Sequence, residues 1–590
     1  MNHATIFWIN GPVIMAETDD GFGMKESVTV GHQALAGEVI RLKGNSVTIQ
    51  VFEDTTGLKP GDPVVGEGFP PSALLGPGMV GRMYDGIQRP LDSLAHSQGD
   101  FIQPGRMQSH EDETWHFVPE VSAGIEVETG TRLGVLVGDS PIQHQVLVPP
   151  GVSGHLNSIA TAGHYTVSEK IAGVVDAAGV ERPVRLRERW PIRVPRPVAR
   201  RLPVQQPLVT GQRVLDTFFP VGKGGACALP GGFGTGKTVL EQTVAKWCDA
   251  DVIVYIGCGE RGNEMAGVLD EFPRLEDPRS GRPLMERTIV IANTSNMPVA
   301  AREASIYTGI TIAEYFRDQG YHVALFADSI SRWAESLREI SGRLEELPAE
   351  EGYPSYMPSR LAEFFERAGS FETLGGQRST LTVVATVSPP GGDFSEPVTS
   401  HTRRFVKSFW ALDRVRAQAR FYPAIDPLVS YTEYLEANAS WWKQHGGLRW
   451  AERRERLLSL LQEQERLEKM VKIVGRDALP QEQRLTLFCA EVFVEGFLRQ
   501  SAFSATDRFC DPRKQNFMLE LMHRFVELSE EALGLGISPE VVQELPLIRR
   551  LQRVGEDMEN GDGEAMAALS EQMESSYQGL MQPHREKAHE

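Results

Sequence analysis

The sequence predicts a multidomain protein that combines β and α/β folds: an N-terminal β-barrel, an inserted β-rich module, a domain built on a parallel sheet, and a C-terminal α-helical domain. Three successive patterns predict this architecture. Short alternating strands with Gly and Pro turns come first, continuous apolar strands between helical patterns follow, and apolar residues at helical spacing come last. The 590 residues are also too many for one hydrophobic core. The expected segments are a barrel at 1–75, a connector at 76–114, the module at 115–190, the parallel-sheet domain at 191–440 and the helical domain at 441–590.

The barrel and the inserted module have the patterning of antiparallel strands. In the first, "SVTVGHQALAGEVIRL" and "NSVTIQVFEDTTGLKPGDPVV" alternate apolar and polar residues, and Lys43-Gly44-Asn45 supplies a turn between them. Short strands with such turns are typical of a small, closed or nearly closed barrel. From about 115 to 190 the β pattern continues, with many glycines and no long amphipathic helix. We therefore expect an inserted β-rich module there.

A dense run of prolines, "WPIRVPRPVARRLPVQQPL", predicts an extended connector into the next domain. The apolar runs "ACALP", "DVIVYIGC", "RTIVIAN", "HVALFADS" and "STLTVVATVS" then alternate with helical patterns, which indicates a parallel sheet covered on both faces. From about 440 the pattern becomes helical. Within 451–475 one apolar stripe is expected to comprise Leu457, Leu460, Leu461, Leu467, Met470, Val471 and Val474.

Composition limits the classes of function. A formal net charge of −19, from 79 acidic and 60 basic residues, counts against binding to nucleic acid or anionic lipid. No apolar run is long enough to span a bilayer, and the N-terminal stretch, broken by Asn10 and Pro12, is interpreted as a strand rather than a signal peptide. The five cysteines form no C-x-x-C pair, which favours a reducing, cytoplasmic setting over a disulfide framework or a zinc site.

The stretch "LPGGFGTGKTVLEQTVAKW" contains the strongest local motif. Gly231, Gly236, Lys237 and Thr238 fit G-x-x-x-x-G-K-[ST], between a short apolar strand and a helical pattern. In such a P-loop, backbone N–H groups face phosphates, the lysine neutralises the β- and γ-phosphates, and the threonine hydroxyl binds Mg²⁺. We therefore predict a site for ATP or ADP with Mg²⁺. Its nucleotide-binding residues are Gly231, Gly232, Phe233, Gly234, Thr235, Gly236, Lys237, Thr238 and Val239.

Hydrolysis also needs a carboxylate near the metal and a group that positions water. Asp328 ends the strand "YHVALFADS" and is the candidate for holding Mg²⁺, with a cap or turn role as the alternative. Glu260, in "VYIGCGERGNEMAG", follows the strand after the P-loop helix, and a short right-handed crossover is expected to bring it beside the loop. On these residues alone, a surface glutamate paired with Arg261 is an equally good interpretation, and Glu264 is a local competitor.

Candidates for the remaining roles are weaker on local evidence. Arg261 and Arg332 lie nearest to these motifs and could stabilise transition-state charge, but both could equally be solvated arginines in salt bridges. Tyr422, in "RFYPAIDPLVSYTEY", could stack on adenine, although packing at a domain junction is the better local interpretation.

Taken together, the motifs resemble the catalytic A subunit of V-type and archaeal or bacterial V/A-type rotary ATPases. The resemblance covers nearly the whole chain. In the parallel-sheet domain it rests on "GGFGTGKT", "GCGERGNEM" and "SPPGGDFSEPV". It extends to "FEDTTGLKPGDPV" and "YDGIQRPL" near the N-terminus and to "PGVSGHLNSIATAGHYTV" in the middle segment. It implies a RecA-like fold for 191–440. It also implies that 115–190 is the extra, non-homologous bulge region that distinguishes A subunits from the β subunits of F-type enzymes.

The resemblance also implies roles for the site residues. Glu260 would polarise the attacking water, and Lys237 and Thr238 would bind phosphate and Mg²⁺. Asp328 would support the metal through water, with Arg261 and Arg332 near the γ-phosphate. The adenine pocket would include Tyr422 and, by a looser correspondence, Phe503 in "LRQSAFSATD".

The implied assembly is an alternating ring of three A and three non-catalytic B subunits, with sites at A/B interfaces and an arginine finger from B. Central-shaft and peripheral-stalk subunits would link this soluble, cytoplasmic sector, peripheral to the membrane, to a rotor that carries protons or sodium ions. Two features depart from the family pattern. Phe421-Tyr422 is closer to the "YPAxDPL" form of F-type β subunits, and Thr235 stands where eukaryotic A subunits have a cysteine, which removes a redox switch at that position.

Two other classes of function are considered. A hexameric RecA-like motor acting on nucleic acid would need basic and aromatic channel loops, which the acidic sequence does not offer. A non-catalytic nucleotide-binding subunit would lack a general base, whereas Glu260 occupies the expected position.

Overall fold

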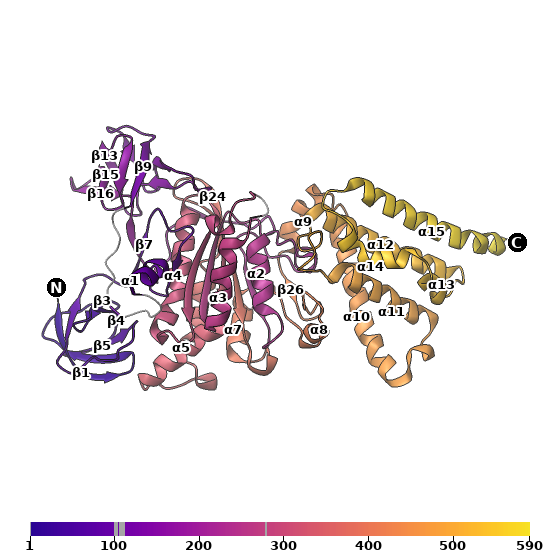
Figure 1. Ribbon diagram of the computed structural model, residues 1–590, viewed down its shortest axis with the longest axis horizontal. Coiled ribbons are helices and arrows are strands. Elements are labelled where there is room, and N and C mark those ends of the chain that lie inside the picture. Colours follow the sequence, from indigo (N-terminus) through magenta and orange to yellow (C-terminus); the bar gives the residue numbers. More distant parts are fainter. Residues whose placement is uncertain (1, 99–103, 106–112, 278–279, 590) are drawn as a thin grey trace.

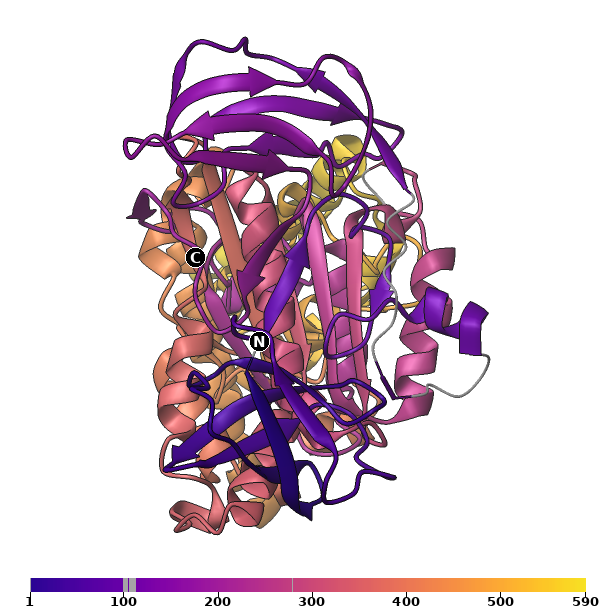
Figure 2. The same ribbon diagram turned by 90° about the vertical axis from the view of Figure 1, so that its left-hand side faces the viewer.

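The computed structural model describes residues 2–98, 104–105, 113–277 and 280–589. The molecule is elongated, with the N-terminal barrel at one end, an α/β domain in the middle and a helical domain at the other end (Figure 1). Viewed from the barrel end, the inserted β-rich module lies above the barrel, and both lie in front of the central sheet (Figure 2). The predicted combination of barrel, parallel-sheet domain and helical domain is confirmed.

The barrel is closed by six antiparallel strands in the order β1-β2-β5-β4-β3-β6. Alternate side chains fill its interior with Val, Ile, Leu and Ala, as expected for a small barrel. The strands are β1 (His3–Asn10), β2 (Val13–Glu17), β3 (Ser27–Val30), β4 (Leu35–Lys43), β5 (Ser46–Val51) and β6 (Pro63–Gly66). Strand β7 (Ser72–Leu75), which was expected within the barrel, instead pairs with β17 (Glu188–Pro191). The barrel therefore closes before residue 72.

The inserted module consists of two four-stranded antiparallel sheets, ordered β10-β13-β15-β16 and β12-β11-β9-β14, around a core of its own. It docks on the central domain, where Gln145 donates from its backbone N–H to Gln319 Oε1 at 3.0 Å. Its strands are β9 (Thr114–Pro119), β10 (Glu126–Val127), β11 (Arg132–Val137), β12 (Gln145–Leu147), β13 (Gly154–Ile159), β14 (Gly163–Thr166), β15 (Lys170–Val175) and β16 (Glu181–Arg185).

The segment before the module, expected to be a connector, carries helix α1 (Leu91–Gln98) and strand β8 (Met83–Tyr84). Strand β8 pairs in parallel with β21, so this segment supplies one edge of the central sheet.

The central sheet has the order β26-β25-β19-β24-β22-β20-β21-β8, with β23 and β18 attached beside β24. All pairings from β25 to β8 along this path are parallel. The strands are β18 (Arg200–Leu202), β19 (Ala226–Pro230), β20 (Val252–Glu260), β21 (Thr288–Thr294), β22 (His322–Asp328), β23 (Gly369–Glu372), β24 (Arg378–Val387), β25 (Ser408–Phe409) and β26 (Tyr431–Thr432).

Helices cover both faces of this sheet, which explains why its strands are continuously apolar. Along β20, Ile253 and Tyr255 belong to one core cluster with α2 and α3, whereas Val254 and Ile256 belong to another with α4, α5, α6 and α7. These helices are α2 (Lys237–Trp247), α3 (Gly262–Glu271), α4 (Val299–Asp318), α5 (Ile330–Arg343), α6 (Met357–Phe365) and α7 (Pro397–Phe405).

The helical domain follows the short helix α8 (Arg414–Gln418) and strand β26. The stripe predicted on α10 is buried at Leu457, Leu460, Leu461 and Leu467, but Val474, the last residue of the helix, is 55% exposed. The helices are α9 (Leu435–Gln444), α10 (Trp450–Val474), α11 (Gln481–Phe493), α12 (Pro512–Gly534), α13 (Pro539–Gln543), α14 (Leu547–Asp557) and α15 (Gly563–His589). Across the described part of the chain, no helix combines the length and apolarity needed to cross a membrane.

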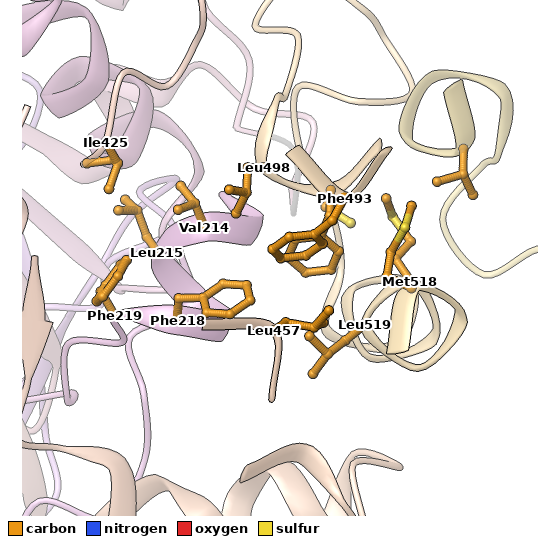
Figure 3. Packing of buried hydrophobic residues seen from close by; sticks show 14 of the residues in the cluster. Val214, Leu215, Phe218, Phe219, Ile425, Leu457, Phe493, Leu498, Met518 and Leu519 are labelled. Carbon is orange, nitrogen blue, oxygen red and sulfur yellow. The ribbon is translucent and has the colours of Figure 1, made fainter. Parts of the chain in front are cut away.

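One hydrophobic cluster joins the central and helical domains (Figure 3). Phe218 and Phe219 come from a π-helical turn before β19, and Phe493 and Phe497 come from the end of α11 and the turn after it. The rings of Phe218 and Phe497 meet edge to face, with centroids 5.7 Å apart. The two domains therefore share a core rather than a wetted interface.

We expect Phe218→Ala to destabilise this junction by about 3–5 kcal/mol, because it removes a fully buried ring and leaves a cavity. The thermal unfolding midpoint of the full chain should fall clearly. Val415→Ala is the control, because Val415 is 72% exposed and its truncation should leave the midpoint unchanged. Equal midpoints for Phe218→Ala and the parent protein would show that the junction contributes little to stability.

Candidate functional site

The P-loop connects β19 to α2, and its backbone requires glycine. Gly234 and Gly236 have φ of 77° and 79°, in the left-handed region that other residues rarely adopt. A Cβ at Gly231 would lie 2.5 Å from Thr235 Oγ1, so this glycine is required for space rather than for φ. At the tip of the loop Phe233 is 83% exposed. The loop thus presents backbone rather than side chains at the start of α2, which is the arrangement that binds phosphate.

Lys237, the first residue of α2, points to the carboxyl ends of the neighbouring strands. Its Nζ lies 3.3 Å from Asp328 Oδ1 and also hydrogen-bonds Ser388 Oγ, just after β24. Burial of the ammonium opposes its charge, but the carboxylates of Asp328, Glu260 and Glu241 outweigh burial and raise the pKa of Lys237. Lys237 is therefore firmly cationic at neutral pH.

Asp328, at the end of β22, is almost fully buried, with 1% of its side chain exposed. Thr238 Oγ1 donates to its Oδ2 at 2.9 Å, and Thr386 Oγ1 donates to its Oδ1 at 2.6 Å. The structure thus brings together the two residues predicted to hold Mg²⁺. Hydroxyl and carboxylate oxygens are ligands that Mg²⁺ accepts. The described residues contain no group of three or more His, Cys, Asp or Glu arranged to hold a metal, so phosphate and water oxygens would have to complete its shell.

Glu260 ends β20 after an irregularity in the pairing with β21. Gly259 makes the turn possible, because its φ is 75° and a Cβ there would lie 2.7 Å from Arg332 Cβ. Among the described residues, Glu260 Oε1 is buried and has no hydrogen-bond partner. Burial and the nearby Asp328 carboxylate raise the pKa of Glu260 from 4.5 to about 6, against the opposing charge of Lys237. Glu260 is therefore ionised at neutral pH and free to accept a hydrogen bond.

The strand that carries Glu260 is not a neighbour of the strand that precedes the P-loop. Strand β20 was expected to follow β19 by a short crossover that ends beside the P-loop, but β24 and β22 lie between them in the sheet. The carboxyl ends of these two strands contribute Thr386, Ser388 and Asp328, of which Ser388 and Asp328 contact Lys237 and Thr386 contacts Asp328. Strand β20 is therefore not adjacent to β19, yet Glu260 lies close enough to the loop for the charge of Lys237 to act on it.

Among the described residues, neither candidate arginine forms a salt bridge with Asp328 or Glu260, although the Glu260 charge contributes to the raised pKa of Arg332. The Arg261 guanidinium stacks over the Phe233 ring, 5.1 Å from its centroid, and Arg332 forms a salt bridge with Glu335 at 2.8 Å. In the described part of the chain, Glu260 forms no salt bridge with Arg261, so the alternative of a surface ion pair does not hold. Glu264, the local competitor of Glu260, is half-buried in the first turn of α3.

The two predicted aromatic residues line the same cavity as the P-loop. This cavity of about 910 Å³ lies between the central and helical domains, and its lining includes Gly234, Thr235, Gly236 and Val239 together with Phe421, Tyr422 and Phe503. Tyr422 donates from its hydroxyl to Thr243 Oγ1 of α2 at 3.0 Å, and burial raises its pKa to about 12. The Phe503 ring is fully exposed. The cavity has a size suited to a nucleotide.

Sequence reasoning missed Glu241, one helical turn after Lys237. Its side chain is fully buried, and neither carboxyl oxygen has a hydrogen-bond partner among the described residues. Burial and the Asp328 charge raise the pKa of Glu241 well above its usual value, which favours the neutral form of this carboxyl. A glutamate four residues after the P-loop lysine, on the apolar face of "TVLEQTVAKW", was the available signal. Ser388 and Thr386 were missed because only the strand order brings them here.

Comparison with known protein families divides the chain in the same way. Residues 211–432 match the nucleotide-binding domain of the ATP synthase alpha/beta family, and residues 6–68 match the β-barrel domain of that family. Residues 108–193 match the barrel-sandwich domain of ATP synthase alpha/beta subunits, and residues 439–533 match the C-terminal domain of V and A type ATP synthases.

Individual relatives match over nearly the full length. The V-type ATP synthase alpha chain of Halothermothrix orenii is 50% identical over 98% of this chain and 99% of its own. The A subunit of the A-type ATP synthase of Methanopyrus kandleri is 53% identical over 92% of this chain and 93% of its own. Among solved structures, the ATPase EscN of the type III secretion system of enteropathogenic E. coli superposes with a TM-score of 0.63 at 20% identity, over 88% of this chain and 100% of that one. This last likeness concerns the fold alone.

The raised pKa of Glu260 predicts a gain of stability in Glu260→Gln at neutral pH. The unfolded chain ionises this carboxyl near pH 4.5 and the folded protein only near pH 6, so above pH 6 the folded state carries a penalty of about 2 kcal/mol. Glutamine removes that penalty. The thermal unfolding midpoint of Glu260→Gln should therefore exceed that of the parent protein at about pH 7.5, and the difference should shrink as the pH falls through 6 towards 4.5. A difference that does not depend on pH would contradict the raised pKa.

Proposed function

The chain belongs to the family of V-type alpha chains and A-type A subunits of ATP synthases, and we propose that it is the catalytic subunit of such a rotary enzyme. It would hydrolyse or synthesise ATP, coupled to the movement of protons or sodium ions across a membrane. One observation supports this proposal above all others. The P-loop lysine, a strand-end aspartate and an ionisable glutamate with an unpartnered oxygen meet at the carboxyl ends of adjacent parallel strands.

In the proposed site, the backbone N–H groups of 231–239 and the Lys237 ammonium bind the β- and γ-phosphates. Thr238 would hold Mg²⁺ directly and Asp328 would support it through water, and the ion would neutralise charge on the transferred phosphoryl group. The hydrogen bond between Thr238 and Asp328 keeps these two oxygen donors adjacent. Burial and the Asp328 charge raise the pKa of Glu241, which disfavours a further negative charge near these donors.

Glu260 is proposed to position the attacking water. Its carboxylate would accept a hydrogen bond from the water and align it with the γ-phosphate, and it would take up the proton as the new P–O bond forms. A pKa of about 6 makes it a better proton acceptor than an ordinary exposed glutamate while leaving it ionised at neutral pH. In synthesis the same group would return the proton.

Arginines are proposed to stabilise the charge of the transition state. Arg261 would leave its contact with Phe233, and Arg332 its salt bridge with Glu335, when a triphosphate occupies the P-loop. A further arginine would come from the neighbouring B subunit. At the other end of the cavity, adenine would lie between Tyr422 and Phe503, whose rings line it.

The proposed assembly follows from the family. Three copies of this chain would alternate with three non-catalytic B subunits, joined by central-shaft and peripheral-stalk subunits. The complex would reach the membrane only indirectly, through its rotor, so that this chain works in the cytoplasm, peripheral to the membrane. A role as a nucleic-acid motor is not favoured, because the net charge of −19 opposes a phosphate backbone.

The direct test measures ATP hydrolysis by the chain mixed with its B partner. Glu260→Gln should lower turnover by about 10²-fold or more while Mg-ADP still binds, because the amide cannot accept the proton of water. Glu264→Gln is the matched control and should retain turnover. If Glu260→Gln keeps its turnover, another group positions the water. The unmixed chain should hydrolyse ATP poorly, because the partner's arginine is missing.

Lys237→Ala tests the phosphate end of the site. It removes the charge that faces the β- and γ-phosphates and leaves Asp328 without its cationic partner, so both Mg-ATP affinity and turnover should fall. Calorimetric binding to the full chain separates the two effects. Unchanged affinity would contradict the phosphate role of Lys237.

A further inference from the structure

The position of Phe503 over the cavity is not fixed by packing of its own ring. The ring is fully exposed, so no packing contact within the described residues orients it. It lies on the loop 499–507, which follows the turn after α11. Its location therefore depends on the contacts that hold the two ends of this loop.

The ends of the loop are held by a buried ion pair between Arg213 and Asp507. Their side chains are 1% and 2% exposed. Arg213 Nη1 bonds Asp507 Oδ1, while its Nε donates to Phe497 O at 2.8 Å and its Nη2 donates to Arg499 O at 2.6 Å. One guanidinium from the central domain thus binds two carbonyls and a carboxylate of the helical domain. The planar arrangement of its donors suits this task, and a lysine could not reproduce it.

Asp507 also closes the loop on itself. Its Oδ2 accepts a hydrogen bond from Ser501 N at 2.6 Å, so the two ends of the segment that carries Phe503 are joined. Helix α14 covers the pair so tightly that a Cβ at Gly555 would lie 2.6 Å from Asp507 Oδ1. The pair is therefore almost fully buried at the edge of the cavity.

Gln500 connects the loop of Phe503 to the turn that carries Tyr422, far earlier in the chain. Its backbone N–H donates to Tyr422 O at 2.8 Å. The Gln500 side chain accepts from Arg213 N at 2.8 Å and donates to Gly211 O and Asp507 O, each at 2.8 Å. With 1% of its surface exposed, Gln500 is a buried junction between three segments.

We propose that Arg213, Asp507 and Gln500 are positioning residues. They set the separation and angle of the Tyr422 and Phe503 rings, and thereby the affinity of the cavity for the nucleotide base. This inference rests on the proposed function, in which those two rings enclose adenine. None of the three side chains has to touch the phosphates. Their effect is confined to the base end of the cavity, whose lining includes Arg213 and Asp507 themselves.

The test compares binding of Mg-ADP and of Mg-pyrophosphate, which has no base, to the full chain by calorimetry. Arg213→Lys keeps the charge but loses the planar set of donors. Gln500→Met keeps the volume and the backbone hydrogen bond to Tyr422 but loses the three side-chain hydrogen bonds that hold this backbone in place. Each should weaken Mg-ADP binding by about tenfold, as loss of base stacking would, and leave Mg-pyrophosphate binding unchanged. Gln500→Met introduces no unpaired buried charge, so it keeps the test informative if Arg213→Lys fails to fold.

Two further variants complete the design. Arg367→Lys is the matched control, because Arg367 is equally a buried arginine paired with a carboxylate, that of Glu314, but on the opposite face of the central sheet. It should change neither affinity. Phe503→Ala should weaken Mg-ADP binding by about tenfold and spare Mg-pyrophosphate.

The outcomes separate this proposal from the proposed function. If Phe503→Ala weakens Mg-ADP binding but Arg213→Lys and Gln500→Met do not, the positioning role is overturned and the base pocket stands. If Arg213→Lys and Gln500→Met weaken the binding of Mg-ADP and of Mg-pyrophosphate equally, these residues support the fold in general and the inference is again overturned. If Phe503→Ala has no effect on Mg-ADP, the base pocket itself is wrong, and the positioning role falls with it.

Discussion

The contact between Lys237 and Asp328 is the constraint on which the site depends. Both side chains are largely removed from water, and neither charge would be tolerated there without the other. Their pairing requires the start of α2 to face the end of β22, and the sheet order β19-β24-β22-β20 provides this. Three neighbouring strand ends then each contribute a polar group: Thr386 from β24, Asp328 from β22 and Glu260 from β20. The site is a product of strand order as much as of the P-loop motif.

The ammonium group of Lys237 lies among three carboxyl groups, and burial is the largest influence on the pKa of two of them, Glu241 and Glu260. Asp328 makes the direct contact with Lys237 and also accepts two hydroxyl hydrogen bonds. Glu241, which is fully buried, has its pKa raised well above the usual value by burial and by the Asp328 charge. Glu260 has its pKa raised to about 6 by the same two influences. Three chemically similar groups thus acquire three different roles from their surroundings, as is usual in catalytic sites.

Local motifs were predictable from the sequence, and relations between distant segments were not. The P-loop and Asp328 could be identified because each depends on a few consecutive residues and on the element beside them. The order of the strands could not, since a short crossover is compatible with an adjacent strand as well as with a more distant one. The pairing of β7 with β17 was missed for the same reason. Phe503 was named through resemblance alone, and Arg213, Gln500 and Asp507 have no local signal, because their partners lie far away in the sequence.

The cavity spans two domains, and this has a thermodynamic consequence. Its phosphate end belongs to the central sheet, while Phe503 and the loop that carries it belong to the helical domain. With a base held between Tyr422 and Phe503, part of the binding free energy of the nucleotide depends on where the helical domain lies. The coupling must be reciprocal: whatever displaces the helical domain changes nucleotide affinity by the same factor by which the nucleotide biases the position of that domain. The core shared at Phe218 and Phe497 and the buried Arg213–Asp507 pair are among the contacts between the two domains that can carry this coupling.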